Sequence, residues 1–118
     1  MEIAVLLLDN GADINLADEF GMSPLSRACA QCATHINNDM VRLLIARGAD
    51  IKSKDLAGMT ALHFSSREGH ELAVKALLEA GAKARHRSRF GNALDQAEAN
   101  RKTKILDMLR ENMGMVKA

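Results

Sequence analysis

The sequence of 118 residues has no tryptophan and no tyrosine, and it contains only three phenylalanines, one proline and two cysteines. The lack of large aromatic side chains argues against a single aromatic core and favours thin helical layers of leucine, alanine and methionine. Two cysteines are too few for a disulfide scaffold and indicate a reducing interior. No segment approaches the run of about 18 apolar residues that would span a membrane, so we expect no membrane partner.

Signals for secretion and for catalysis are also missing. The apolar run from Ile3 to Leu8 is short, lacks a basic segment before it and is followed by Asp9, so it does not resemble a signal peptide. The sequence has no G-x-S-x-G, no H-E-x-x-H and no phosphate-binding glycine loop. The acidic pair Asp18 and Glu19 lies on a predicted turn without an apolar pocket. We therefore expect a cytoplasmic protein (nuclear also, in a eukaryote) that is not an enzyme and has no cofactor.

Charge is distributed unevenly although the net charge is only +1. Residues 1–25 hold five acids and no base, whereas residues 82–118 hold nine bases and four acids. If the chain folds as a stack in sequence order, the molecule is a rod with an acidic end and a basic end.

The segment from Asp55 to Ala82 is the clearest structural unit. Thr60 is suited to cap a first short helix, and Gly69 and Gly81 are suited to end the first and the second helix. Apolar residues recur at helical spacing in the second helix and predict its buried face: Leu72, Val74, Leu77 and Leu78. Helices of about ten residues are too short to be stable alone in water, so the unit requires neighbours.

Those neighbours are repeats of the same pattern. Gly11, Gly48 and Gly81 are spaced by 37 and 33 residues, and each follows a pair of large aliphatic residues. A period near 33 with the helix opening Thr60-Ala61-Leu62-His63 resembles the ankyrin repeat. The resemblance covers Met1 to about Glu111 and implies an all-α solenoid of stacked helix-turn-helix units with hairpin-like loops.

We expect one domain over residues 1–118, with five parts. Residues 1–17 form an N-terminal half repeat, 18–54 a repeat with a four-residue insertion, and 55–87 the best-matching repeat. Residues 88–111 form a degenerate C-terminal capping repeat, followed by a tail over 112–118. The insertion predicts one extra helical turn or a longer loop between the helices, with Asp39 near the start of the second helix.

The capping repeat departs most from the pattern. Phe90 lies where the hairpin glycine is expected, and Asp95 replaces His63 at the third helical position, where an acid can reach back to the cap amide. Arg101 and Lys102 replace the Gly-His turn between the two helices, which leaves the formation of that turn an open question.

Cys29, Cys32 and His35 have a spacing found in metal and dithiol sites. A structural zinc site needs four ligands, however, and no second pair of ligands is near in sequence. Cys29 also falls at a position where ankyrin repeats place a small buried residue, so we expect no metal site. The resemblance implies structural roles for His63 and His70, whereas His86 is expected in solvent.

In the ankyrin family the hairpin tips and first helices form a concave binding surface. Matching positions imply a surface at the following residues: Glu19, Phe20, Met22, Leu56, Ala57, Met59, Arg67, Glu68, Arg87 and Arg89. Four of these, Phe20, Met22, Leu56 and Met59, are apolar where contact with solvent is expected. They predict an interface with a partner protein, unless the two methionines pack beneath the hairpins.

Two alternatives follow from other features. The apolar stretch Met1–Asp9 lacks the first helix of its repeat, which predicts either a fragment or frayed terminus, or self-association through this edge. The alternative function is an interaction or oligomerisation segment of a larger enzyme whose N-terminal part is missing here. The basic residues from Lys83 to Arg89, with Arg101, Lys102 and Lys104, suggest a solvated cap or an acidic protein partner; without a nucleic-acid motif or stacking aromatics other than Phe90, we do not expect nucleic acid.

Overall fold

The computed structural model describes residues 13–30 and 35–114, which contain six α-helices. The helices are α2 (Pro24–Ala30), α3 (His35–Ala46), α4 (Ala61–Glu68), α5 (Glu71–Glu79), α6 (Ala93–Ala99) and α7 (Thr103–Asn112). Within these residues the only β-type pairing is an isolated bridge between Ser88 and Gly91. The predicted all-α solenoid is confirmed.

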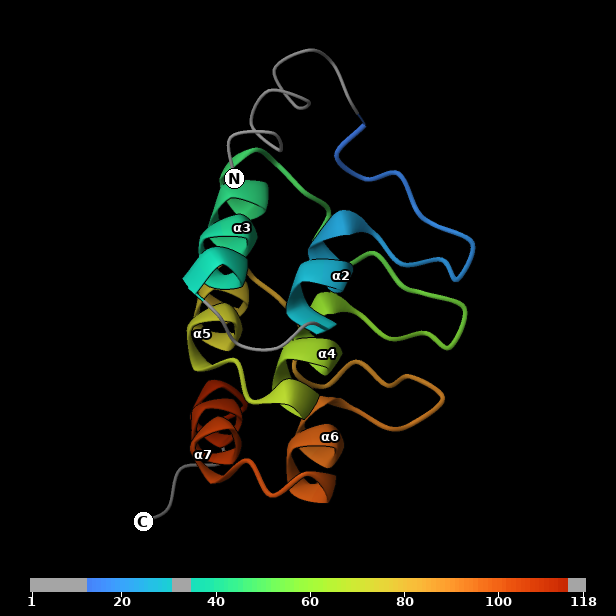
Figure 1. Ribbon diagram of the computed structural model, residues 1–118. Helices are drawn as coiled ribbons and strands as arrows, with labels where there is room; N and C mark the ends of the chain where they lie inside the picture. The colour runs from blue at the N-terminus through green and yellow to red at the C-terminus, as the bar shows by residue number, and fades with distance from the viewer. Residues whose placement is uncertain (1–12, 31–34, 115–118) are drawn as a thin grey trace.

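The helices form two columns, which Figure 1 shows side by side. In the inner column α2 packs on α4 and α4 packs on α6, while in the outer column α3 packs on α5 and α5 on α7. Each inner helix also packs on the outer helix that follows it in the chain. Sequence order is therefore spatial order, as expected for a solenoid.

The core lies between the two columns and consists mainly of aliphatic residues. The large aliphatic side chains that are at most 1% exposed are Leu25, Val41, Leu62, Val74, Leu77, Ile105 and Leu109. Burying one such side chain contributes about 1.5–3 kcal/mol, so short helices become stable through contact with neighbours. The prediction that Leu72 belongs to the buried face of α5 is wrong, because its side chain is 46% exposed.

Three hairpins project from the inner column toward one side of the molecule (Figure 1). We name them the first (residues 18–22), second (55–59) and third (88–91) hairpin. The Leu56 N–H donates to the Phe20 carbonyl at 3.2 Å, and the Arg89 N–H donates to the Ala57 carbonyl at 2.7 Å. These two backbone hydrogen bonds hold the three hairpins in a fixed register.

The insertion in the 18–54 repeat lengthens an outer helix. Helix α3 has 12 residues, whereas α5 has 9, and the additional residues lie at its N-terminal end. This agrees with the alternative of an extra helical turn. Asp39 is the fifth of the 12 residues of α3, near the start of the helix but just outside its first turn.

The third hairpin corrects the predicted register of the capping repeat. Gly91, not Phe90, occupies the glycine position, with a φ of 101° and a backbone hydrogen bond from the Ser88 N–H to its carbonyl at 2.7 Å. Asn92 then caps α6 directly, so this hairpin lacks the residue that Met22 and Met59 provide in the others. Phe90 is therefore equivalent to Phe20, a side chain at the hairpin tip.

The turn between α6 and α7 forms without glycine. Arg101 adopts a φ of 55°, close to the 78° of Gly69 in the equivalent turn between α4 and α5. The Lys102 N–H donates to the Ala97 carbonyl at 2.9 Å, as the His70 N–H donates to the Ser65 carbonyl at 3.0 Å. A left-handed conformation at a residue with a Cβ costs roughly 1–2 kcal/mol.

Replacing Arg101 with glycine is therefore expected to stabilise the protein by about 0.5–1 kcal/mol, after the greater flexibility of glycine in the unfolded chain is subtracted. Chemical denaturation measures the difference. Asn100 supplies the control: its φ is −106° and its side chain donates to the Gln96 carbonyl at 2.9 Å, so Asn100→Gly should destabilise. Equal effects of the two substitutions would contradict the interpretation of Arg101.

Candidate functional site

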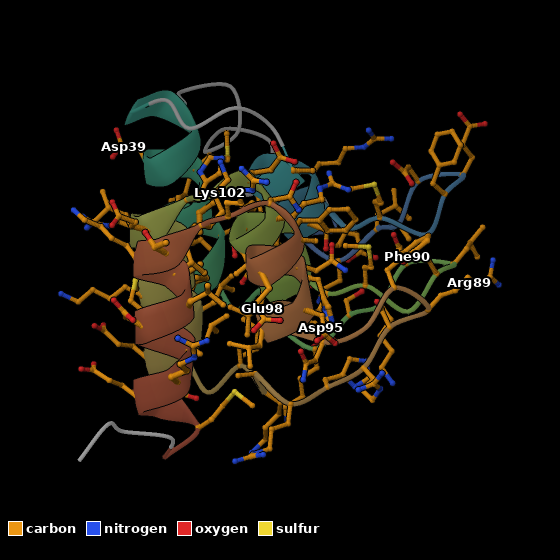
Figure 2. All side chains as sticks on the ribbon, turned by 90° about the horizontal axis from the view of Figure 1, so that it is seen from below. Asp39, Arg89, Phe90, Asp95, Glu98 and Lys102 are labelled. Atoms are coloured by element: carbon orange, nitrogen blue, oxygen red, sulfur yellow. The ribbon has the colours of Figure 1, made fainter. Side chains whose placement is uncertain are left out.

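Large apolar side chains are exposed at the tips of all three hairpins. Phe20 is 55% exposed, Leu56 75% and Phe90 61%. Figure 2 shows Phe90 and Arg89 at the far end of the third hairpin, away from the helices. Because the backbone hydrogen bonds fix the hairpins against one another, these three side chains form one row, which we name the apolar tip row.

The first hairpin is fixed by the carboxylate of Asp18. Its Oδ1 accepts hydrogen bonds from the Phe20 and Met22 amides at 2.9 and 3.0 Å, and its Oδ2 accepts from Arg27 Nε at 2.7 Å. The partial loss of hydration raises the pKa of Asp18, but these hydrogen bonds and the Arg27 charge outweigh it and lower the pKa. The Arg27 guanidinium also lies 5.7 Å from the centre of the Phe20 ring, which ties α2 to the hairpin tip.

The other two hairpins use different groups for the same purpose. In the second hairpin Asp55 Oδ1 accepts from the Ala57 and Met59 amides, both at 2.9 Å. In the third, Ser88 Oγ accepts from the Phe90 amide at 3.0 Å. Gln96, on α6, donates from Nε2 to the Phe90 carbonyl at 2.8 Å. All three tips are thus held by local polar contacts.

The structure places most of the predicted binding residues on the surface. Glu19, Phe20, Leu56, Arg87 and Arg89 are exposed, and Met22, Ala57, Arg67 and Glu68 are half-buried. Arg67 Nε donates to Glu68 Oε2 at 2.8 Å, and the Arg67 guanidinium lies 5.1 Å from the centre of the Phe64 ring. Met59 is only 3% exposed, so the expectation that it contacts solvent is wrong; it packs beneath the second hairpin.

Sequence reasoning missed three exposed residues, of which Phe90 belongs to the apolar tip row and Arg27 contacts it. Phe90 was placed at the glycine position because one residue is missing from its hairpin. Leu16, which is 68% exposed, precedes the first hairpin in a stretch with no periodic signal. Arg27 lies on a helix, and only its spacing of nine residues from Asp18 hinted at the ion pair between them.

His63 joins the start of α4 to the segment before the third hairpin. Its Nε2 lies 2.9 Å from the His86 carbonyl, and its Nδ1 accepts from the Thr60 N–H at 3.0 Å, with the Thr60 hydroxyl at 2.9 Å. A carbonyl only accepts, so Nε2 carries the proton and the ring is neutral. The predicted structural hydrogen bond is confirmed. His86 is half-buried and lies edge-on to His63, so the expectation that it is in solvent is wrong.

This arrangement predicts a dependence of stability on pH. Burial lowers the pKa of His63 below its ordinary value of 6.5, and the His86 carbonyl only partly opposes the shift. Since the unfolded chain binds the proton more readily, the free energy of unfolding is highest above about pH 6.5 and falls as the pH drops toward the folded-state pKa. Urea denaturation between about pH 5 and 8 measures it. His63→Asn should lose this part of the slope; an unchanged slope would contradict the assignment.

The structure tests only part of the predictions made for the two cysteines and for the N-terminal stretch. Cys29 is fully buried, and burial raises the pKa of its thiol to about 12, which suits a small core residue. Cys32, the His35 side chain and the proposed self-association stretch Met1–Asp9 lie outside what the structure describes, so these stay predictions. Among the described residues, no helix is long and apolar enough to cross a membrane.

Comparison with known proteins places the chain in a family. A family model of ankyrin repeats in three copies matches residues 1–88 and 30–116. Ankyrin repeat protein OPG189 of Variola virus is 33% identical over 90 residues, which are 76% of this chain and 16% of that protein. The mouse B-cell lymphoma 3 protein homolog is 37% identical over 82 residues, 69% of this chain and 17% of that protein.

A third relative, the human SH3 and multiple ankyrin repeat domains protein 2, is 39% identical over 88 residues, 72% of this chain and 4% of that protein. The chain thus spans less than a fifth of the length of these relatives. Ankyrin repeats are generally non-catalytic modules for protein interaction. The family model matches almost the whole length of the chain, and the stacked helix pairs with projecting hairpins agree with it. This chain therefore belongs to the ankyrin repeat family.

Proposed function

We propose that this chain is a non-catalytic module that binds a partner protein through the apolar tip row and the adjoining inner helices, as a scaffold, adaptor or inhibitor. The observation that carries the proposal is the exposure of Phe20, Leu56 and Phe90 on hairpins locked in register. Exposed apolar groups on a rigid frame are typical of the centre of a protein interface.

The surroundings of the tip row support an interface as well. Charged residues flank it, with Glu19 on the first hairpin and Arg89 on the third. Arg27 on α2 lies over the Phe20 ring of the row, and Arg67 on the inner helix α4 lies over the Phe64 ring. Arginine and aromatic side chains are enriched among the residues that contribute most to binding.

The test is affinity capture from the source organism with the wild type, a tip-row variant (Phe20→Ser, Leu56→Ser and Phe90→Ser together) and Leu72→Ser. Leu72 is the matched control, because it is a comparably exposed apolar residue on the outer helix α5. We expect a partner that the wild type and Leu72→Ser retain and that the tip-row variant loses by at least about tenfold in affinity, since truncated anchors each cost about 2 kcal/mol or more.

Circular dichroism should first show that all three proteins are folded. A partner held equally by all three proteins would place the interface elsewhere. Loss of the partner in Leu72→Ser alone would assign binding to the outer column.

A second candidate is an interaction segment within a larger enzyme. It is favoured by two plant relatives: the probable E3 ubiquitin-protein ligase XBOS33 of rice, 34% identical over 79 residues, and the E3 ubiquitin-protein ligase XBAT33 of Arabidopsis thaliana, 36% identical over 78 residues. This chain covers 14% of each. Sequencing the complete transcript tests the idea: a catalytic domain in the same reading frame supports it, and its absence excludes it.

A further inference from the structure

A hollow of about 650 Å³ lies between the chain segments that lead into the second and third hairpins. Four of its lining side chains are cationic: Lys52 and Lys54 from one segment, and Lys83 and Arg85 from the other. Thr60 and His86 contribute to the same wall. We name this feature the basic hollow. It is separate from the apolar tip row, although Leu56 follows Lys54 by only two residues.

The alternation of side chains explains why the cations converge. In residues 82–85 the two alanines are buried, while Lys83 and Arg85 are exposed. In residues 51–54, half-buried Ile51 and Ser53 alternate with exposed Lys52 and Lys54. Each segment contains a turn, in which the Ser53 N–H donates to the Asp50 carbonyl at 3.4 Å and the His86 N–H donates to the Lys83 carbonyl at 3.3 Å, and both segments present their cations outward. Stacking one repeat on the next places the two sets on one face.

The charges of the basic hollow are not neutralised by the fold. Among the residues that the structure describes, ion pairs involve Arg27, Arg67, Lys104 and Arg110, and none involves Lys52, Lys54 or Lys83. Arg85 donates to the Met113 carbonyl at 2.8 Å, which fixes its position without cancelling its charge. Cations of one sign along a concave wall concentrate the local field and attract anionic ligands.

His86 provides a second, independent observation. Its Nε2 is buried and has no hydrogen-bond partner in the part of the chain that the structure describes. A buried polar atom without a partner is unfavourable and is uncommon without a functional reason. An anionic group that enters the hollow would supply an acceptor for this nitrogen when it carries a proton.

We propose that the basic hollow binds an acidic segment of a partner protein, with carboxylates placed against Lys52, Lys54 and Lys83. The inference rests on the proposed function and adds the charge of the partner. A peptide suits the surface better than nucleic acid does. Glu19, an exposed acid on the first hairpin, would repel a continuous phosphate backbone, whereas Leu56, exposed and two residues after Lys54, offers an apolar contact to a peptide.

The test uses fluorescein-labelled decaglutamate as the probe and fluorescence anisotropy as the readout. The hollow variant is Lys52→Ser with Lys83→Ser. The control variant, Lys75→Ser with Lys104→Ser, removes the same charge from exposed positions on α5 and α7. We expect the hollow variant to bind at least about tenfold more weakly than the wild type, and the control to stay within about twofold. Peptide addition should also shift the amide NMR signals of Thr60 and His86.

Several outcomes overturn the proposal. Equal weakening of both variants would show only a general charge effect, and absence of wild-type binding would exclude an acidic segment. A deoxythymidine decamer that binds more tightly than decaglutamate and loses affinity in the hollow variant would assign the surface to nucleic acid. The tip-row variant should still bind decaglutamate, so failure of this inference is distinguishable from failure of the proposed function.

Discussion

Replacing His63 with alanine is expected to lower the free energy of unfolding by about 3 kcal/mol, because a fully buried ring is lost together with two hydrogen bonds. The Thr60 N–H and the His86 carbonyl would each be left without their partner. A domain of this size is stabilised by about 5–15 kcal/mol in total, so this single change removes a large share. Urea denaturation above about pH 7 measures it with the ring neutral.

The capping repeat provides a graded control for His63. Asp95 occupies the equivalent position on α6, and its carboxylate accepts from the Asn92 N–H at 2.9 Å, as predicted for that position. Asp95 is only half-buried, and among the described residues its side chain bonds only within the cap, so Asp95→Ala should cost about 1 kcal/mol. His63→Asn, which can keep the cap bond, should fall between the two. If His63→Ala were no worse than Asp95→Ala, the link to His86 would contribute nothing.

Replacing Gly21 with alanine is expected to destabilise the protein by about 2–3 kcal/mol through two separate effects. Its φ of 77° disfavours any side chain. A Cβ at this position would also lie 3.0 Å from the Leu56 nitrogen and 3.2 Å from the Asp55 Cα, both of which are backbone atoms of the second hairpin. To make room, that hairpin would have to move away from the Phe20 carbonyl.

Gly48→Ala distinguishes the cost of a side chain at positive φ from the cost of the steric contact between hairpins. Its φ of 87° is similar, but an added Cβ would meet nothing within 4 Å, so Gly48→Ala should cost only about 1 kcal/mol. The difference between the variants measures the contact between hairpins. Hydrogen exchange at the Leu56 amide should accelerate in Gly21→Ala alone. Equal destabilisation by the two alanines, with equal exchange at Leu56, would show that the hairpins are not coupled.

The repeating elements of this fold were predictable because each is set by local chemistry that recurs. Ser23 caps α2 by accepting a hydrogen bond from the Ser26 N–H at 3.2 Å, and Gly69 ends α4 as expected. Helices were therefore assigned correctly from caps, glycines and aliphatic spacing. The row of hairpin tips followed from the same period, which placed Phe20 and Leu56 correctly on the surface.

The errors arose at positions where contact with a neighbouring repeat determines whether a side chain is buried. The sequence of a single repeat does not reveal such contacts. The missing residue before Asn92 shifted the count by one and concealed Phe90. Met59 is buried because the hairpins stack, whereas its apolar character alone is equally consistent with an exposed anchor. His86 is half-buried, and its carbonyl is bonded to His63 Nε2, which lies 23 positions earlier in the chain. Contacts between repeats thus determine which side chains remain on the surface.

The backbone hydrogen bonds between hairpins have a consequence for recognition. The second hairpin donates to the first through Leu56 and accepts from the third through Ala57. Its most exposed side chain, Leu56, therefore stands on a main chain restrained from both sides. Association with a partner normally loses conformational entropy as loops become ordered. Here much of that ordering takes place during folding, so in the proposed interface Leu56 acts as a preorganised anchor, and its contacts translate more fully into affinity than those of an equally apolar residue on an unrestrained loop.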